Sequence, residues 1–173
     1  MAANQNQASP ARRITVECAR RGKKALIAGC ADLLYSRYDE VDDGLITVLG
    51  GESARYVLDG HEGGRSGYWP RVWAARGLLH AWDDTAADGY AAHSSAAGGS
   101  AAGGSAADGT AAHAIIHATE DDAWRVREMA AKVIARHRVG EGLDAVAGLR
   151  DDPVPRVRAA AQRAVVTLTA AKS

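Results

Sequence analysis

The sequence contains no phenylalanine, only two cysteines and no excess of either charge. Its 21 basic side chains (Lys and Arg) equal its 21 acidic ones, so no overall field attracts nucleic acid or an anionic membrane. Cys18 and Cys30 are too few for a disulfide framework, which favours a reducing compartment. No apolar run reaches the roughly 20 residues that span a bilayer, and residues 1–10 lack the apolar core of a signal peptide. We therefore expect a soluble, cytoplasmic protein without membrane contact.

What the sequence does contain is one short motif used three times. It reads Tyr-Trp-Pro-Arg-Val-Trp-Ala-Ala over 68–75, Ala-Trp-Arg-Val-Arg-Glu-Met over 123–129 and Val-Pro-Arg-Val-Arg-Ala-Ala over 154–160. Superposition of the shared Arg-Val aligns Arg71, Arg125 and Arg156. An internal repeat of this kind is typical of stacked supersecondary units.

The spacing of the last two copies predicts helices. The interval from Arg125 to Arg156 is 31 in the sequence numbering, which suits a helix, a turn, a second helix and another turn. Apolar residues recur at helical spacing in the first helix of each copy, and residues 141–149 form the expected second helix. Asp121-Asp122 and Asp151-Asp152 precede the first helices, and Asp is a favourable N-cap residue. The fold class predicted is therefore all-α.

The first interval of the repeat is too long. From Arg71 to Arg125 it is 54, which exceeds the period of 31 by 23, and a segment of that length, 88–110, consists mostly of Ala, Gly and Ser. Such a segment behaves as a flexible coil because it cannot bury enough apolar surface to offset its ordering entropy. We interpret 88–110 as an insertion in a helix–helix turn, with a binding loop or a processing site as the alternative.

The domain organisation predicted from these patterns has four parts. They are a disordered N-terminus over 1–11, a helical cap or degenerate repeat over 12–66, the repeats with their insertion over 67–169, and a tail over 170–173. Within the cap, helices are expected over 24–36, 44–49 and 53–58, followed by a flexible joint at 60–67. Terminal units of a repeat array are atypical because they must cover its ends.

The repeated pattern resembles that of HEAT repeats, including the short HEAT-like variety of bacterial proteins and of phycobilin lyases. The motif Asp-x-x-x-Arg-Val-Arg-x-x-Ala spans 152–161 and 121–130, and 67–76 matches it loosely. The resemblance implies a short α-solenoid of stacked antiparallel helix pairs with an N-terminal helical cap. The first copy departs from the pattern because Trp73 stands where the family prefers Arg, so a uniform arginine ladder is not expected.

The repeated arginines are the first candidate site. They are Arg71, Arg125, Arg127, Arg156 and Arg158. One interpretation is that they form bidentate bonds with the aspartates of the turns and so lock each repeat to the next. The other is a line of cations on one face that grips phosphates or an acidic partner. A glycosylase family built on HEAT-like repeats binds DNA in this way, but that resemblance is only architectural.

Tryptophans are the second candidate site. Trp69 and Trp73 are four positions apart and share a helical face, and Trp124 opens the next copy. In a sequence without Phe they serve either as wedges between helices or as an exposed patch for a protein partner, since Trp and Arg dominate binding hot spots.

Three weaker features suggest other chemistry. His113 and His117 have a spacing that suits zinc, but the glutamate of an HExxH motif is missing and no third ligand is evident. His61-Glu62 is the single His-Glu pair, whereas iron-dependent hydroxylases built from HEAT-like repeats use several. The basic cluster within 12–24 is either a solvated leading helix or a contact for nucleic acid or an acidic protein.

These observations favour a non-enzymatic adaptor or scaffold that binds a protein partner and needs no cofactor or metal. The second hypothesis is nucleic-acid binding through the basic N-terminus and the arginine columns. The third is a metal-dependent or lyase-type enzyme.

Overall fold

The computed structural model describes residues 8–82 and 111–170, and the regular secondary structure in these ranges is entirely helical. The α-helices are α1 (Pro10–Arg21), α2 (Lys23–Leu34), α3 (Asp43–Gly50), α4 (Glu52–Leu58), α5 (Tyr68–His80), α6 (Ala111–His117), α7 (Trp124–His137), α8 (Leu143–Gly148) and α9 (Pro155–Ala170). Short 3-10 helices are η2 (Tyr38–Glu40), η3 (His61–Ser66), η6 (Ala118–Glu120), η7 (Gly140–Gly142) and η8 (Leu149–Asp151). The all-α prediction is confirmed for the described residues.

Several predicted boundaries shift by a few positions. Helix α1 begins at Pro10, inside the segment 1–11 that was expected to be disordered, because Ser9 caps it and Pro10 suits the first helical turn. Helix α9 runs through Ala170, where a tail was expected. The predicted insertion at 88–110 lies outside the described residues.

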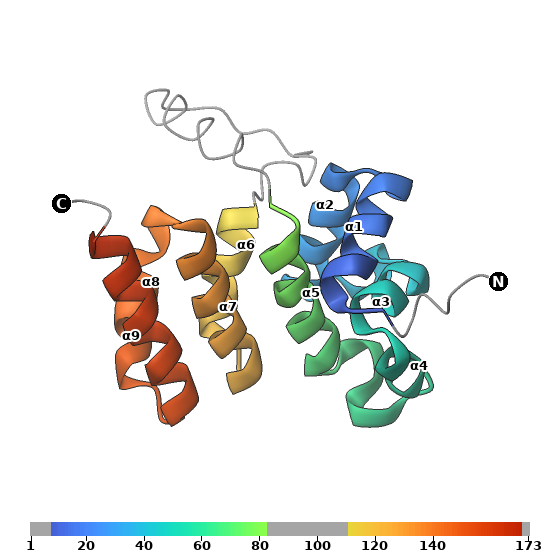
Figure 1. The fold of residues 1–173 in the computed structure, drawn as a ribbon. Coiled ribbons are helices and arrows are strands. Elements are labelled where there is room, and N and C mark those ends of the chain that lie inside the picture. The colour runs from blue at the N-terminus through green and yellow to red at the C-terminus, as the bar shows by residue number, and fades with distance from the viewer. Residues whose placement is uncertain (1–7, 83–110, 171–173) are drawn as a thin grey trace, which may run out of the picture.

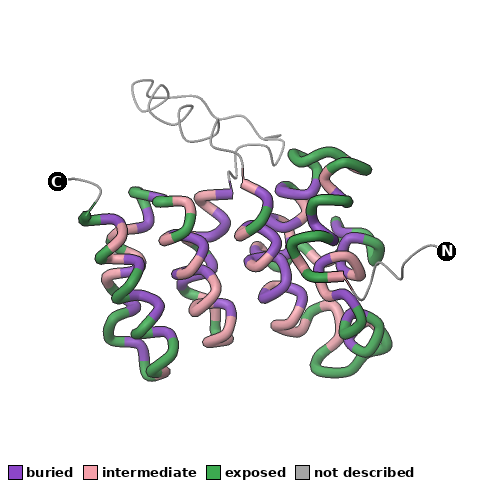
Figure 2. The backbone as a smooth tube through the Cα atoms, in the orientation of Figure 1, coloured by how far each residue is buried: buried purple, intermediate pink, exposed green. Residues whose placement is uncertain are grey.

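The three first helices of the repeats stand side by side. Helix α5 packs on α7, and α7 packs on α9, while α6 packs on α7 and α8 packs on α9 (Figure 1). Helices α1–α4 gather beside α5, where α2 contacts both α5 and α6 and α3 contacts α5. Figure 2 shows the buried positions along the inner sides of these helices, with exposed positions gathered at the two ends.

The structure corrects the alignment of the first copy by two positions. The buried positions of α5 coincide with those of α7 when 56 is added to each residue number of α5. The matching pairs are Pro70 with Val126, Ala74 with Ala130, Ala75 with Ala131, Gly77 with Val133 and Leu78 with Ile134. In this register Tyr68 matches Trp124, and Arg71 matches Arg127 rather than Arg125. Superposition on the shared Arg-Val therefore gives the wrong register for α5, because the register of a helix follows from its buried positions and not from two shared residues. The excess over the period of 31 is therefore 25 rather than 23.

Trp73 fills the joint between the N-terminal helices and the repeats. Only 4% of Trp73 is exposed. A Cβ atom at Gly50 of α3 would lie 2.6 Å from Cζ3 of Trp73, so only glycine permits this approach. Trp73 is therefore a wedge between helices, which corrects its choice as a partner-binding residue.

Arginines also satisfy the C-terminal end of α3. The Nε atom of Arg13 donates to the Val48 carbonyl at 2.7 Å, and its Nη2 atom donates to the Leu49 carbonyl at 3.2 Å. Arg76 of α5 also donates to the Leu49 carbonyl, at 2.9 Å. The last carbonyls of a helix lack intrahelical partners and carry a partial negative charge, so cations are favourable there. Arg13 is buried, which corrects the view of the basic N-terminus as a wholly solvated helix.

Candidate functional site

Two bidentate arginine–aspartate pairs join successive repeats. In the first, Arg71 Nε and Nη2 donate to Asp121 at 2.6 and 3.3 Å. In the second, Arg127 Nε and Nη2 donate to Asp152 at 2.7 and 3.2 Å. The side chains of Arg127 and Asp152 are 14% and 4% exposed, so water screens their pair weakly. The predicted pairing of arginines with turn aspartates is present at Arg71 and Arg127.

Each aspartate of these pairs also holds its own turn. Oδ1 of Asp121 accepts from the Ala123 backbone N–H at 2.8 Å, and Oδ1 of Asp152 accepts from Val154 in the same way and at the same distance. Burial disfavours the charged form of Asp152, but the bonds from Arg127 and Val154 outweigh it and hold the pKa of this carboxyl below its usual value.

The third copy of the arginine, Arg158, makes only half of these bonds. Its Nη1 atom donates to the Asp152 and Pro153 carbonyls at 2.7 and 3.1 Å. Arg127, one period earlier in the sequence, donates from the same atom to the Asp121 and Asp122 carbonyls at 2.7 and 2.9 Å. Within 8–82 and 111–170, no carboxylate pairs with the Nε side of Arg158.

The other two arginines lie on aromatic rings. The guanidinium carbon of Arg125 is 4.4 Å from the ring centre of Trp124, 5.6 Å from that of Trp69 and 5.8 Å from that of Tyr68. The guanidinium carbon of Arg156 is 6.0 Å from the ring centre of Trp124. Cations near an aromatic face are attracted by its quadrupole. We call Tyr68, Trp69, Trp124, Arg125 and Arg156 the aromatic–arginine ladder.

The ladder runs across the first turns of three neighbouring helices, α5, α7 and α9. Its members are half-buried, apart from the exposed Arg156. In the corrected register Trp69, Arg125 and Arg156 occupy one column, and Tyr68 and Trp124 occupy the adjacent one. The ladder therefore places aromatic and guanidinium groups in contact with one another across three helices.

A small hollow adjoins the ladder at its N-terminal end. It has a volume of about 270 Å³ and is lined by Ser53, Tyr56, Val57, Glu62, Trp69 and Trp73. Tyr56 is 55% exposed and stacks on His61 with a ring separation of 4.0 Å. The hollow extends the aromatic surface of the ladder onto α4.

A row of cations follows the outer side of the first helices. In α7 Arg125, Lys132 and Arg136 share one face, and the acid among them, Glu128, pairs with Lys132 at 2.8 Å. Arg163 of α9 stands one period after Lys132 and is exposed. This row is locally basic although the whole chain has no net charge.

Half of the basic side chains in the cluster near the N-terminus are paired within the molecule. Glu17 accepts from Arg20 and Arg21, and these bonds hold its pKa below the usual value. Arg21 also donates to Asp42 at 2.7 and 3.3 Å and, with the backbone N–H of Leu45, lowers the pKa of Asp42 to about 2. Arg12, Lys23 and Lys24 remain exposed.

The histidines considered as zinc ligands lie on α6. His117 stacks on Tyr35 with a ring separation of 5.1 Å. Among the residues that the structure describes, no three His, Cys, Asp or Glu side chains gather closely enough to hold a metal ion. In the same residues, no helix is both long and apolar enough to cross a membrane.

Comparison of the chain with protein-family models, with curated proteins and with solved structures gave no significant match.

Proposed function

We propose that the protein is a non-enzymatic scaffold, built as a short HEAT-like α-solenoid with an N-terminal helical cap, that binds a protein partner. The repeated sequence pattern, the side-by-side first helices and the recurring arginine–aspartate pairs support this architecture. The aromatic–arginine ladder is the observation that carries the binding function. Trp, Tyr and Arg are the residues most enriched at energetic hot spots of protein interfaces.

The chemistry of the ladder specifies the kind of partner. Half-buried rings offer apolar contact area, and Arg125 and Arg156 keep donors free for carboxylates because the aromatic faces engage only the plane of each guanidinium. A partner segment that places an apolar side chain beside an acidic one matches both features. Stacking has already restricted these side chains, so binding loses little further conformational entropy.

The test combines variants of the ladder with a matched control. The full-length chain and its Trp69→Ala and Arg125→Ala variants are used for affinity purification from the source organism, followed by mass spectrometry. A specific partner should be captured by the unaltered chain and by Val166→Ala, which alters an exposed residue of α9 away from the ladder. Capture should be lost with both ladder variants while their circular dichroism stays unchanged.

Capture that persists in both ladder variants would contradict the proposal, because it would place the contact elsewhere. Loss of capture together with loss of helicity would indicate a structural role. The more conservative Trp69→Phe should then retain both the fold and part of the binding.

Nucleic-acid binding is the second candidate, and the cation row on α7 and α9 favours it. The internal pairing of Arg13, Arg20 and Arg21 reduces the contribution expected from the N-terminus.

Salt dependence tests this second candidate. Binding of a labelled DNA duplex or single-stranded RNA to the row should weaken about tenfold or more between about 50 and 200 mM salt, as counterion release requires. Lys132→Ala and Arg163→Ala should each reduce the salt slope by about one phosphate contact. Absence of binding at the lower salt concentration would exclude this candidate.

A further inference from the structure

The C-terminal end of the helix stack repeats a binding geometry that the molecule uses twice in its interior. Arg71 and Arg127 each donate through Nε and Nη2 to an aspartate of the following copy. Arg158 occupies the same position of α9 and forms the same Nη1 bonds to the carbonyls of its own turn. Those bonds orient the guanidinium of Arg158. Its Nε and Nη2 atoms, which at Arg127 donate to Asp152, are therefore positioned to donate to a carboxylate.

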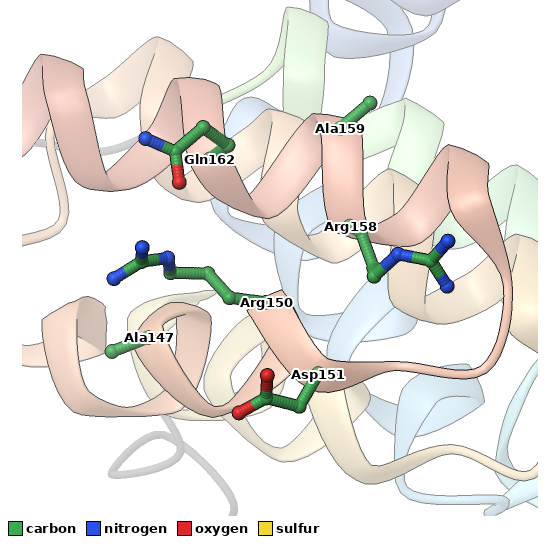
Figure 3. Close-up of a pocket in the computed structure, with 6 residues that line it drawn as sticks. All are labelled: Ala147, Arg150, Asp151, Arg158, Ala159 and Gln162. Carbon is green, nitrogen blue, oxygen red and sulfur yellow. The ribbon is translucent and has the colours of Figure 1, made fainter.

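A groove of about 580 Å³ lies beside this arginine, between α8 and α9. Its lining residues are Ala147, Arg150, Asp151, Arg158, Ala159 and Gln162 (Figure 3). Figure 3 shows the guanidinium of Arg158 near the start of α9, pointing away from Arg150 and Gln162. The groove therefore offers cationic groups at two separate points.

Part of the corresponding surface of the preceding copy is buried. One period before Arg150 and Gln162 stand Thr119 and Ala131, which are 4% and 0% exposed, respectively. Helix α7 carries Ala131 and packs on α9, whereas within the described residues no helix packs on the far side of α9. The part of the groove around Arg150 and Gln162 is thus a surface that packing between copies buries in the preceding copy.

The geometry points to a docking site at this end for a partner polypeptide that presents an aspartate in the turn before a helix. The aspartate would accept two hydrogen bonds from Arg158 and one from the backbone N–H two positions later in its own turn, as Asp152 does at Arg127. This site extends the proposed scaffold function to a second surface and uses none of the ladder residues.

Charge and polarity identify the occupant as acidic. Arg150 and Gln162 of the groove are exposed, whereas Thr119 and Ala131, which lie one period earlier, are buried. Two arginines against the single Asp151 leave the groove with a positive balance. A partner turn with a second carboxylate near its aspartate would meet Arg150, since arginine binds carboxylates in a planar, bidentate manner.

A peptide from the chain itself is a suitable probe. Residues 149–170 contain Asp152 and the helix that occupies the interior counterpart of the groove. Titration of this peptide into the ¹⁵N-labelled full-length protein should shift the Nε–H resonance of Arg158 and leave those of Arg71 and Arg127 in place. The Asp152→Asn peptide keeps an oxygen acceptor for the Val154 backbone N–H but lacks the charge, and it should bind about tenfold more weakly.

Protein variants complete the test. Arg158→Ala should weaken binding about tenfold, and Arg158→Lys should restore little because lysine lacks the planar fork. Arg163→Ala removes an exposed charge of the same helix outside the groove and should leave the affinity unchanged. Arg125→Ala should also bind the peptide normally, so failure of the ladder and failure of this site are distinguishable.

Three results would overturn the inference. The first is no change at Arg158 up to millimolar peptide, and the second is equal affinity for the unaltered and the Asp152→Asn peptides. The third is a concentration-dependent dimer in sedimentation velocity that Arg158→Ala abolishes, since this would assign the groove to a second copy of the chain.

Discussion

Both the repeats and the N-terminal helices pair arginine with aspartate, as at Arg21 and Asp42, but only in the repeats does such a pair recur with the period of the sequence. In the repeats, Arg71 and Arg127 donate to an aspartate of the next copy, so one geometry recurs. Among the N-terminal helices, Arg13 donates to main-chain carbonyls at the end of α3, and no copy of that contact exists in the described residues. A contact between copies must recur with the period of the sequence, whereas a contact that caps one helix end need not. This difference explains why the period of the sequence pointed to the arginines that pair between copies and not to Arg13.

The joint between the two regions is where substitution should have the largest effect. Trp73→Ala removes a nearly buried ring that packs on Gly50, and it should lower the free energy of unfolding by about 3–5 kcal/mol. Trp69→Ala is the matched control, because it changes the same residue type one turn away at a half-buried position and should cost clearly less. Urea unfolding of both variants measures the difference. Equal losses would mean that Trp73 is not the wedge between the regions.

The second comparison sets Arg127 against Arg158. Arg127→Ala leaves the buried Asp152 carboxylate without its guanidinium and should cost about 2 kcal/mol. Arg158→Ala removes the equivalent side chain, which keeps the carbonyl bonds but has no carboxylate partner in the described residues, and should cost within about 0.5 kcal/mol.

Chemical denaturation of both variants tests this contrast, and hydrogen exchange locates the loss. Protection should fall in α7 and α9 of Arg127→Ala and stay unchanged in α1 and α3. Comparable losses in the two arginine variants would show that the carbonyl bonds, rather than the aspartate, stabilise the joint between copies.

Much of the fold could be predicted from the sequence because the helices repeat. Burial at Ile115 and Ala118 recurs one period later at Val146 and Leu149, as the spacing predicted for the second helices. The register of the first copy could not be predicted, because Arg-Val occurs there two positions later than the burial pattern requires. Nothing in the short string distinguishes the two registers, whereas the packing of α5 on α7 does.

The candidate site was predicted only in part. Arg125 and Arg156 share a column with Arg71 in the sequence, yet they stack on rings instead of pairing with aspartates. The Trp at position 124 beside Arg125 was the available signal, but side-chain direction at a helix start cannot be read from spacing. The contact of Tyr68 with Arg125 was not predicted, because only the corrected register aligns Tyr68 with Trp124. Trp73 resembled Trp69 in sequence, and only the glycine opposite it explains its burial.

Acid should weaken both regions through their depressed carboxyl pKa values. Asp42 of the N-terminal region has a pKa of about 2 against about 4 in an unfolded chain, and the pKa of Asp152 in the repeats is also lowered. Their contributions are fully present above the unfolded pKa and are lost as the pH falls through the folded one. The free energy of unfolding should therefore decline between about pH 5 and pH 2. Asp42→Asn should flatten the decline in urea titrations at several pH values, and an unaltered slope would contradict the assignment.

The smallest expected effect is a stabilisation, and it again separates the two regions. Gly148 ends α8 with helical backbone angles, and a Cβ there meets nothing within 4 Å. Gly148→Ala should therefore raise the free energy of unfolding by about 0.5–1 kcal/mol through helix propensity.

Gly77 is also helical, but its Cβ would lie 2.8 Å from Leu49 Cδ2 and 2.9 Å from Cys30 Sγ. The cost of overpacking at Gly77 should exceed the gain in helix propensity, so Gly77→Ala should lower the free energy of unfolding by about 1 kcal/mol. Thermal and urea unfolding should thus give opposite signs for one substitution type, and a gain at both positions would show that α2, α3 and α5 pack more loosely than the structure indicates.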